Sequence, residues 1–419
     1  MEKLLIKGGN ILRGEISCSG AKNAALPMIA ATILNDEKII FKNLPYLQDI
    51  TTMFELLGSM GADISLDESM DFSIRANNLT DLEARYELVK TMRASILVLG
   101  PMVAKHGYAK IALPGGCAIG SRPVNFHLDA LKQLGAKISL ENGYIEATAD
   151  KLIGADITFD GVTVTGTENI MMAACLAKGT TTLRNVAMEP EVSDLAEFLN
   201  QMGAKISGAG TEVIKIEGVS SLSSTTYSIP ADRIEAGTYL VAAALTGGEI
   251  TINSIQPKRL DNVIERLKMC GAEIDVKIDS ISLNMKNKRP IPVNISTSPF
   301  PGFPTDMQAQ FSVLNALADG DSIVEENVFE NRFMHVQELN RMGCKISTKG
   351  NIANITGVSE ISGAQVMATD LRASASLILA GLVADGETIV DRIYHIDRGY
   401  ERIEEKLSYI GANITRLPS

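Results

Sequence analysis

The segment LGSMGADI, residues 57–64, ends an apolar helical pattern at a glycine and continues into alternating apolar and polar residues. A glycine at such a point can take the left-handed conformation that closes a helix, and the alternation after it predicts a strand. The same pattern occurs five more times along the chain: LKQLGAKI (131–138), LNQMGAKI (199–206), LKMCGAEI (267–274), LNRMGCKI (339–346) and LSYIGANI (407–414). Six helix–glycine–strand segments therefore organise the fold.

The spacing of these segments is regular. Their glycines are Gly61, Gly135, Gly203, Gly271, Gly343 and Gly411, separated by 74, 68, 68, 72 and 68 residues. A leucine stands four places before each one: Leu57, Leu131, Leu199, Leu267, Leu339 and Leu407. Repeats of this length exceed those of the common solenoids and indicate six copies of a compact α/β unit. We interpret these glycines and leucines as scaffold that caps and packs helices.

A second helix precedes most of these segments and is rich in alanine. Examples are AALPMIAATIL (24–34), NIMMAACLA (169–177), GTYLVAAALT (237–246) and ASASLILAGL (373–382). A helix that is apolar on all sides is typical of a buried position. A small turn and a β-rich run follow each of these helices, so every repeat is expected to contain one buried helix and one amphipathic helix.

Length and composition favour a folded protein of two domains. A chain of 419 residues exceeds the size at which one hydrophobic core usually stops growing, and three repeats in each domain match that estimate. Hydrophobic residues make up 45% and charged residues 21%, which is ordinary globular usage. No apolar run is long enough to span a membrane, and the start MEKLLIKGGN lacks the apolar core of a secretory signal. We expect a cytoplasmic protein without a membrane partner.

The charge balance limits the partners. Fifty acidic and 39 basic residues give a formal charge of −11, which opposes non-specific binding of nucleic acid. An anionic substrate would need a local basic cluster. The oligomeric state remains open at this stage.

The sequence also lacks the signatures of several enzyme classes. It contains no phosphate-binding P-loop, no dinucleotide fingerprint, no HExxH zinc motif and no Ser-His-Asp signature. The five cysteines lie 58 or more residues apart, which fits free thiols better than a zinc site. The histidines are scattered and are interpreted as polar or hydrogen-bonding residues: His106, His127, His335 and His395. We expect neither a metal nor a cofactor.

Five segments depart from the repeat, and chemistry is expected on such loops. In SGAKNAALP (19–27), Lys22 and Asn23 precede a buried helix and could hold an anion or a sugar, although a solvated lysine would also fit. In LPGGCAIGSRPVNFH (113–127), a glycine-rich loop carries Cys117 close to Arg122. The cation could tune the proton affinity of that thiol, but an incidental loop cysteine is the alternative.

The other three segments carry carboxylates and arginines. Asp306 follows the Pro-Gly-Phe-Pro stretch in FPGFPTDMQAQF (300–311), where a helix cap and a general base are both open. VFENRFMH (328–335) contains Arg332. The C-terminal segments ATDLRAS (368–374) and YHIDRGYER (394–402) contain Asp370, Arg372 and Arg398, for which surface ion pairs are the alternative.

Taken together and in this order, SGAKNAALP, LPGGCAIGSRPVNFH, FPTDMQAQF, VFENRFMHV, MATDLRASAS and YHIDRGYERIEEKL closely resemble the UDP-N-acetylglucosamine enolpyruvyl transferase family of the EPSP-synthase-like superfamily. The resemblance runs from end to end. It implies two domains, each an inside-out α/β barrel of three βαβαββ repeats, with the substrates in a cleft between them. The implied domains are residues 1–21 with 231–419, and an inserted domain 22–230.

The resemblance also implies roles for single residues. Lys22, Arg122 and Arg398 would hold the phosphate and carboxylate of phosphoenolpyruvate, while Asn23 and Asp306 would contact the sugar. Contacts to the UDP-sugar would come from Arg93, Arg122, Pro123, Val124, Asn125, Phe126, Thr163, Val164 and Val328. Arg332, Asp370 and Arg372 would complete the substrate site.

The implied reaction suits these residue types. Asp306 would accept the proton of the sugar 3-hydroxyl as that oxygen attacks C2 of phosphoenolpyruvate, and Cys117 would deliver a proton to C3. The lysine and the arginines would stabilise a tetrahedral phospho-ketal until phosphate leaves. The family catalyses the first committed step of peptidoglycan synthesis, which links it to cell-wall biogenesis, cell shape, cell cycle and cell division. A thiol at this place could also trap phosphoenolpyruvate as a covalent pyruvate adduct and react with fosfomycin.

The sequence departs from the family pattern at one position, and three alternative functions are considered. Some relatives have a lysine where this chain has Gly161, in FDGVTVTGTEN (159–169), which leaves the affinity for the UDP-sugar open. The rivals are enolpyruvyl transfer to shikimate 3-phosphate, a non-catalytic sugar-nucleotide sensor on this scaffold, and an RNA-end-processing relative. Presence of Lys22, Cys117 and Asp306 together argues against the sensor, and the net charge argues against the last.

Overall fold

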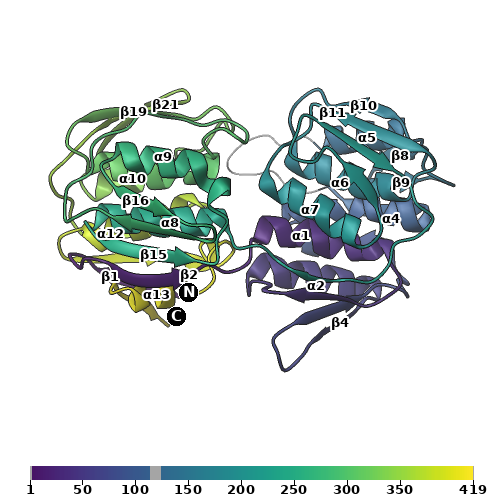
Figure 1. Cartoon of the computed structure of the whole chain (residues 1–419), viewed down its shortest axis with the longest axis horizontal. Coiled ribbons are helices and arrows are strands. Elements are labelled where there is room, and N and C mark those ends of the chain that lie inside the picture. The colour runs from purple at the N-terminus through teal and green to yellow at the C-terminus, as the bar shows by residue number, and fades with distance from the viewer. Residues whose placement is uncertain (1, 114–123, 419) are drawn as a thin grey trace. The chain divides into compact units, whose positions relative to one another are not determined.

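The computed structural model describes residues 2–113 and 124–418 of the chain. These residues form two compact units, which are described separately (Figure 1). Unit 1 comprises residues 2–19 and 231–418, and unit 2 comprises residues 20–113 and 124–230. The expected domains, 1–21 with 231–419 and 22–230, stay a prediction about which segments fold independently.

Each unit contains three four-stranded sheets. The sheets of unit 1, in strand order, are β22 (Gln365–Met367)–β23 (Glu387–Asp391)–β1 (Lys3–Lys7)–β24 (Asn413–Leu417), β16 (Glu273–Val276)–β17 (Ser280–Asn284)–β15 (Glu249–Asn253)–β2 (Arg13–Ser17), and β18 (Ile295–Ser296)–β19 (Asp321–Glu325)–β21 (Ile352–Thr356)–β20 (Lys345–Lys349). The sheets of unit 2 are β14 (Thr226–Ser228)–β3 (Ile39–Lys42)–β5 (Phe72–Arg75)–β4 (Asp63–Leu66), β6 (Glu83–Ala84)–β7 (Tyr108–Ala112)–β9 (Tyr144–Thr148)–β8 (Lys137–Glu141), and β10 (Asp156–Thr158)–β11 (Thr180–Arg184)–β13 (Val213–Glu217)–β12 (Lys205–Ser207).

All six sheets share one pairing pattern. A parallel pair, such as β10 with β11, is extended by two antiparallel strands. In three sheets, those that begin at β6, β10 and β18, the parallel pair is joined through a buried helix and the following strands through an amphipathic one, so the order along the chain is βαβαββ. The other three sheets have the same pairing, but each takes one strand from a distant part of the chain: β1, β2 or β14. The expected α/β fold of two inside-out barrels with six βαβαββ repeats is confirmed.

The helices divide into a buried set and an outer set. Three buried helices at the centre of unit 1 pack on one another, as do three in unit 2 (Figure 1). The helices of unit 1 are α8 (Arg233–Leu245), α10 (Gln308–Ala316) and α12 (Ala373–Val383) at the centre and α9 (Asp261–Met269), α11 (His335–Arg341) and α13 (Ile403–Tyr409) outside. Those of unit 2 are α1 (Lys22–Ala31), α4 (Leu99–His106) and α6 (Val164–Cys175) at the centre, and α2 (Gln48–Met60), α5 (Asn125–Gln133), α7 (Pro190–Gln201) and the short α3 (Tyr86–Val89) around them.

Short 3-10 helices connect some of these elements. They are η1 (Thr32–Leu34), η2 (Arg93–Val98), η3 (Pro257–Leu260), η4 (Thr305–Met307) and η5 (Ile393–His395). Two of them, η2 and η4, each lead directly into a central helix, α4 and α10. Both also carry a residue that the family resemblance assigns to the site.

The repeated glycines act as predicted. All six have positive φ, from 95° at Gly135 to 110° at Gly61, and each follows an outer helix. Only glycine takes this left-handed conformation without the strain that a Cβ brings. The six leucines four places earlier are fully buried. The scaffold reading of both residue types is therefore confirmed.

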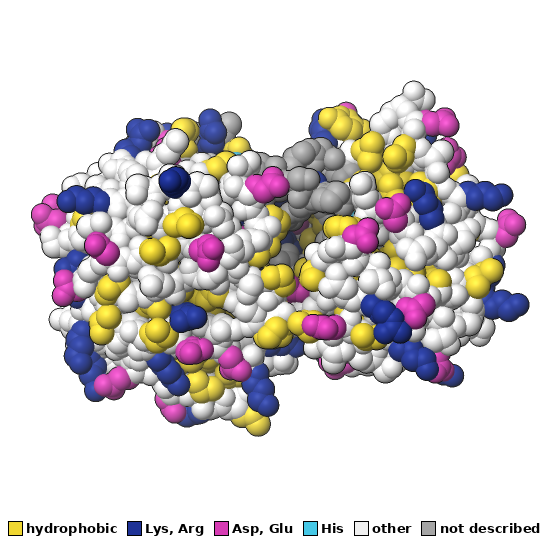
Figure 2. Space-filling model, turned by 90° about the horizontal axis from the view of Figure 1, so that it is seen from above, with side chains coloured by type: hydrophobic (Ala, Val, Ile, Leu, Met, Phe, Trp, Pro, Cys, Tyr) yellow, Lys and Arg dark blue, Asp and Glu magenta, His cyan; other side chains and the backbone are white. Residues whose placement is uncertain are grey.

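The surface carries charges of both signs. On the face drawn in Figure 2, basic and acidic side chains lie interspersed over both units, with single hydrophobic side chains between them. Scattered exposed hydrophobic residues are normal on a folded domain. Within the parts of the chain that the structure describes, no helix combines the length and the hydropathy needed to cross a membrane.

Candidate functional site

Asp306 lies in η4, directly before the buried helix α10. Its side chain is 26% exposed and does not cap that helix, which begins without a side-chain cap. Instead, the Asp306 Oδ1 atom accepts a hydrogen bond from Nη2 of Arg332 at 2.6 Å, and Oδ2 lies 3.7 Å from Nε of Arg372. The cap alternative is excluded, because the carboxylate is held between two guanidinium groups.

Arg332 is buried, with 5% of its side chain exposed. Its Nη1 donates to Oγ1 of Thr305 at 2.7 Å, and that hydroxyl donates to the buried carboxylate of Glu326 at 2.8 Å. Burial by itself lowers the pKa of a guanidinium, but the nearby carboxylates of Asp306 and Asp370 outweigh it, and the pKa of Arg332 is raised. Arg332 is therefore charged and fixed in direction.

Arg372 is equally buried and has a second carboxylate partner. Its Nη2 donates to Oδ2 of Asp232 at 2.9 Å, its Nη1 donates to the carbonyl oxygen of Gly399 at 3.2 Å, and its guanidinium lies 5.0 Å from the ring centre of Tyr400. Burial opposes the charge, yet Asp232, Tyr400 and Asp306 raise the pKa of Arg372 well above its ordinary value. These contacts together fix the orientation of the planar guanidinium group of Arg372.

Asp232 was not anticipated from the sequence. It is the N-cap of α8, where its Oδ1 accepts from the backbone N–H of Ile234 at 2.8 Å, while Oδ2 receives Arg372. Asp232 and Arg372 are 140 residues apart, so no local pattern could reveal the pair. We call Asp232, Asp306, Arg332 and Arg372 the Asp306 cluster.

A buried amide supports this cluster from α10. Gln310 is fully buried, and its Nε2 donates to the carbonyl oxygen of Asp306 at 2.9 Å and to Oγ1 of Thr238 at 3.1 Å. The same Nε2 lies 3.3 Å from the hydroxyl of Tyr400, whose ring lies against the guanidinium of Arg372. The backbone of Asp306 and the ring below Arg372 are thus tied to one central helix.

The remaining predicted residues of unit 1 lie on loops around the cluster. Asp370 lies just before α12, where its Oδ1 accepts from the backbone N–H of Arg372 at 2.9 Å, and its buried Oδ2 has no hydrogen-bond partner among the described residues. Val328 donates its N–H to Glu326 at 2.9 Å. Arg398 lies half-buried in the turn after η5, where burial and the charge of Arg398 lower the pKa of His395.

His335 begins α11 in the same unit. It is fully buried, and neither ring nitrogen has a hydrogen-bond partner within residues 2–113 and 124–418. Burial lowers its pKa to about 4, with Asp370 acting against this and Arg332 adding to it. The unpartnered nitrogens of His335 and the unpartnered oxygen of Asp370 leave polar atoms unsatisfied in the interior near Arg332, a feature common at functional sites.

In unit 2, Lys22 is the first residue of the buried helix α1 and is itself 6% exposed. Its Nζ forms an ion pair of 2.8 Å with Oδ2 of Asp49 in α2, which is also buried. A solvated lysine is therefore excluded. Asn23, the next residue, is exposed.

The predicted UDP-sugar contacts of unit 2 lie at the first turns of helices. Arg93 begins η2, and Val124, Asn125 and Phe126 lie at the start of α5. Thr163 is the N-cap of α6, where its Oγ1 accepts from the backbone N–H of Gly166 at 3.2 Å, and Val164 follows it. Backbone N–H groups at helix starts are suited to bind anions.

Gly161 and Phe126 are neighbours in space. A Cβ built on Gly161 would lie 3.2 Å from Cζ of the Phe126 ring. In this chain Gly161 therefore lies directly beside an aromatic ring. This contact joins two of the segments that the resemblance assigns to the UDP-sugar.

Three predicted residues, Cys117, Arg122 and Pro123, lie outside the described residues, as does the glycine-rich loop that contains them. Of the others, the structure brings Asp306, Arg332 and Arg372 together and places Asp370 next to them in unit 1. It places Lys22, Asn23, Arg93 and the segments at 124–126 and 163–164 in unit 2.

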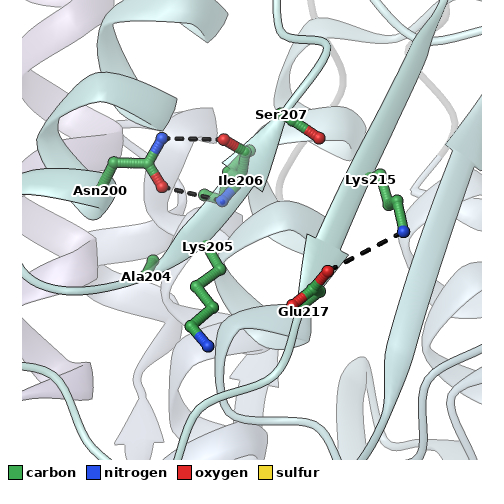
Figure 3. A pocket seen from close by; sticks show the side chains of 7 residues that line it. All are labelled: Asn200, Ala204, Lys205, Ile206, Ser207, Lys215 and Glu217. Atoms are coloured by element: carbon green, nitrogen blue, oxygen red, sulfur yellow. Dashed lines mark hydrogen bonds and ion pairs between the residues drawn. The ribbon is translucent and has the colours of Figure 1, made fainter.

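A surface hollow elsewhere in unit 2 does not coincide with these residues. It has a volume of about 410 Å³ and is lined by residues of the β12–β13 edge and the end of α7 (Figure 3). Asn200, at its rim, already uses its amide to bind the backbone N–H and carbonyl of Ile206, at 2.8 and 2.9 Å. The lysines around it are exposed, and none of the predicted site residues that the structure describes lines it, so we assign no activity to it.

The described residues contain no group of three or more His, Cys, Asp or Glu side chains placed to hold a metal ion. Four of the five cysteines are described, namely Cys18, Cys175, Cys270 and Cys344, and each is a buried free thiol. Burial raises the pKa of Cys175 to about 12. A thiol of that kind is not a proton donor or nucleophile at neutral pH.

Comparison with known proteins agrees with this architecture. A sequence model of the EPSP synthase (3-phosphoshikimate 1-carboxyvinyltransferase) family matches residues 6–407. A UDP-N-acetylglucosamine 1-carboxyvinyltransferase of Hydrogenovibrio crunogenus is 57% identical over 416 residues, which are 99% of this chain and 100% of the relative.

Solved structures give the same picture. The enolpyruvyl transferase NikO from Streptomyces tendae superposes with a TM-score of 0.89 at 26% identity, covering 100% of this chain and 99% of that one. An EPSP synthase from Acinetobacter baumannii superposes with a TM-score of 0.78 over 100% of both chains at 18% identity, which shows the shared fold. The six repeats, the two barrels and these full-length similarities show that the chain belongs to the EPSP synthase family of enolpyruvyl (1-carboxyvinyl) transferases.

Proposed function

We propose that this protein transfers the 1-carboxyvinyl group of phosphoenolpyruvate to the 3-hydroxyl of UDP-N-acetylglucosamine and releases phosphate. The observation that carries the proposal is the 57% identity over 99% of the chain to a UDP-N-acetylglucosamine 1-carboxyvinyltransferase. The Asp306 cluster supplies the matching chemistry, because it combines a partly exposed carboxylate with two buried cations.

In the proposed reaction, the sugar 3-hydroxyl oxygen attacks C2 of phosphoenolpyruvate and its proton passes to Asp306. C3 of phosphoenolpyruvate gains a proton from Cys117, which gives a tetrahedral phospho-ketal. C3 then loses a proton, the bond from C2 to the phosphate oxygen breaks, and phosphate leaves with the electron pair. The product is the enolpyruvyl ether.

Support for Asp306 in this role comes from its surroundings. Arg332 and Arg372 fix the direction of the carboxylate, and Gln310 fixes its backbone. A group held in this way loses little freedom when it accepts a proton from a bound hydroxyl. For Lys22, Arg122 and Arg398, we propose the family role of holding the phosphate and carboxylate of phosphoenolpyruvate.

We further propose that Asn23, Arg93, the segment 122–126, Thr163, Val164 and Val328 contact the nucleotide sugar, and that Arg332, Asp370 and Arg372 complete the site. Thr163 supports this, since it is the N-cap of α6 and lies at the start of a helix, where backbone N–H groups suit a diphosphate. The product would enter peptidoglycan synthesis in the cytoplasm and so serve cell-wall biogenesis, cell shape and division. No metal or cofactor takes part in the proposed steps.

The test is phosphate release from phosphoenolpyruvate with each acceptor. We expect turnover with UDP-N-acetylglucosamine and none with shikimate 3-phosphate. Turnover with shikimate 3-phosphate alone would replace the proposed acceptor, and binding of the nucleotide sugar without phosphate release would indicate a sensor.

The role of Cys117 has its own test. Fosfomycin should inactivate the protein over time, because a thiolate opens its epoxide, and Cys117→Asp should keep activity while resisting the compound. The reference pKa of a carboxyl is about 3.9 against about 8.5 for a thiol, so the optimum should move toward acid. Inactivation of Cys117→Asp at the parent's rate would remove Cys117 from the mechanism. Mass spectrometry after incubation with phosphoenolpyruvate should detect the covalent pyruvate adduct in the parent only.

A further inference from the structure

The three described segments of unit 2 that we assign to the nucleotide sugar begin close to one buried amide. Asn169 of α6 is fully buried. Its Oδ1 accepts from the backbone N–H of Gly100 in α4 at 2.6 Å, and its Nδ2 donates to the carbonyl oxygen of Ile96 in η2 at 2.9 Å. A backbone donor and a backbone acceptor together leave only one orientation for this side chain.

That orientation determines the state of His127. Nδ2 of Asn169 also lies 2.9 Å from Nδ1 of His127, and since Nδ2 can only donate, Nδ1 must accept and carry no proton. The ring proton therefore lies on Nε2, which is 3.4 Å from Oγ1 of Thr165. The imidazole of His127 is 3% exposed, and burial together with the charge of Arg93 lowers its pKa to about 4. His127 is thus neutral with one tautomer.

The arrangement leaves little room for change. A Cβ on Gly100 would lie 2.3 Å from Oδ1 of Asn169, so this position requires glycine for α4 and α6 to approach. Most of the other buried residues of the central helices of unit 2 are apolar, although α6 also buries Thr167 and Glu168. A polar group in such a core costs stability unless every hydrogen bond is made. We call His127, Asn169, Gly100, Ile96 and Thr165 the His127 cluster.

The elements joined by the His127 cluster are the ones that carry the proposed contacts. His127 directly follows the segment 124–126 on α5, Thr165 follows Thr163 and Val164 on α6, and Ile96 lies in the 3-10 helix that Arg93 begins. One buried amide thereby sets the first turns of all three elements relative to one another. The backbone N–H groups of a helix start bind a diphosphate only when they are aimed correctly.

We propose that Asn169 and His127 are positioning residues for the nucleotide-sugar half of the site, with Asn169 holding His127 in its neutral Nε2–H tautomer and the pair fixing the starts of α5, α6 and η2. This inference rests on the proposed function. Neither residue touches the reacting atoms, so their effect falls on binding of the nucleotide sugar and not on the chemical step.

The test compares two buried amides. Asn169→Asp keeps the shape but cannot donate to Ile96 and to His127. Asn315→Asp is the matched control: Asn315 of α10 is also fully buried and binds the backbone N–H and carbonyl of Val293, at 2.9 and 2.8 Å, away from every proposed site residue. KM and kcat are measured for both substrates in both variants, alongside thermal unfolding.

We expect Asn169→Asp, which loses two donated hydrogen bonds, to raise KM for UDP-N-acetylglucosamine at least about tenfold, the cost of one unmade buried hydrogen bond. The values of kcat and of KM for phosphoenolpyruvate should change less than about threefold. Asn315→Asp should lower the unfolding temperature without this selective rise. If both variants shift KM for the nucleotide sugar equally, Asn169 is a structural residue only and the inference fails.

Two measurements do not depend on Asn169→Asp folding. Nitrogen-15 NMR of the histidine rings in the parent protein should show His127 with protonated Nε2 and bare Nδ1 at pH 7, and UDP should perturb these signals. Thr165→Val should raise KM for the nucleotide sugar about two- to threefold, since it removes only a long hydrogen bond. A cationic or Nδ1–H His127, or signals unmoved by saturating UDP, would overturn the inference. Absence of turnover in the parent would instead refute the proposed function and leave the NMR result standing.

Discussion

The Asp306 cluster of unit 1 and the His127 cluster of unit 2 are built on the same scaffold in opposite ways. Each rests on a fully buried amide of a central helix, Gln310 in α10 and Asn169 in α6. Gln310 binds the backbone of Asp306, whose carboxylate pairs with two arginines, and one of these also pairs with Asp232. Around Asn169 the partners are a neutral histidine and backbone groups.

The difference follows from what each cluster is proposed to do. Ionised groups in a buried site act strongly on a reaction that moves protons and charge, but each needs a counter-charge. A neutral network has no such requirement and can fix backbone geometry alone. The comparison therefore suggests proton chemistry in unit 1 and positioning of a bound nucleotide in unit 2.

The largest expected effect is that of Asp306→Asn. This change keeps the size of the side chain but removes the proton acceptor, so kcat should fall at least about 10²-fold, as expected for a lost general base. Steady-state kinetics and a binding titration with UDP-N-acetylglucosamine measure the two properties separately, and binding should change far less. Activity close to that of the parent protein would mean that Asp306 does not accept the proton.

Asp232→Asn tests whether the charges of unit 1 stabilise one another. The asparagine can still cap α8, but its amide would meet Arg372 without a negative charge. Breaking a buried pair costs about 3 kcal/mol, and we expect somewhat less because Asp306 remains 3.7 Å from Arg372. Denaturant unfolding gives the value. Asp156→Asn is the control, since its pair with Arg184 is exposed and should contribute little to the unfolding free energy. Equal losses of unfolding free energy in both variants would contradict a stabilising role for the buried pair of Asp232 and Arg372.

The pH dependence of stability tests a property that both units share. Burial lowers the pKa of His127 and of His335 to about 4, below the usual value of about 6.5. As the pH falls, the unfolded chain therefore takes up these protons first, so their contribution is complete above about pH 6.5 and is lost between about pH 6.5 and 4. Each histidine contributes a slope of up to about 1.4 kcal/mol per pH unit.

His127→Gln and His335→Gln should each flatten the curve of unfolding free energy against pH in that window. The measurement is chemical denaturation at a series of pH values for the parent and both variants. NMR titration adds a direct check, because both rings should stay neutral at pH 5.5. A ring that titrates near pH 6.5 would show that water reaches this histidine in the folded protein.

The smallest effect is expected at Gly161. In Gly161→Ala the new Cβ would lie 3.2 Å from the Phe126 ring, which must move by a few tenths of an ångström. We expect KM for UDP-N-acetylglucosamine to change by less than about threefold, with kcat unaltered, because one weak contact is disturbed. A larger effect on kcat than on KM would show that Phe126 acts on the chemical step and not only on binding of the nucleotide sugar.

Local patterns were enough to predict the scaffold. The glycine caps, the buried leucines and the alanine-rich helices each follow from a few neighbouring residues, and the structure confirms them. Asp306 and Arg332 stood out because they interrupt the repeat. Their pairing could not be derived, however, since spacing alone left Asp306 open as a cap.

The residues that sequence reasoning missed act across long separations. Asp232 looks like an ordinary helix cap until Arg372 is brought to its second oxygen, and Asn169 lies in an apolar run that reads as core. His127 and Asn169 are 42 residues apart, and only the packing of α5 on α6 joins them. Polar residues inside otherwise apolar central helices are the signal that could have found both amide hubs.

The strand order has a consequence for how the protein is made. Unit 2 draws every strand from residues 39–228, whereas in unit 1 strand β1 pairs with β24, with Leu4 opposite Arg416. A ribosome releases the chain from its N-terminus, so unit 2 can close while synthesis continues, but the first strand must wait for the last. Nascent chains arrested beyond residue 260 should therefore resist protease over residues 20–113 and 124–230 and be cut before residue 19. The sheet that contains β1 and β24 would then form last, and unit 1, which carries the Asp306 cluster, could not be complete on an unfinished chain.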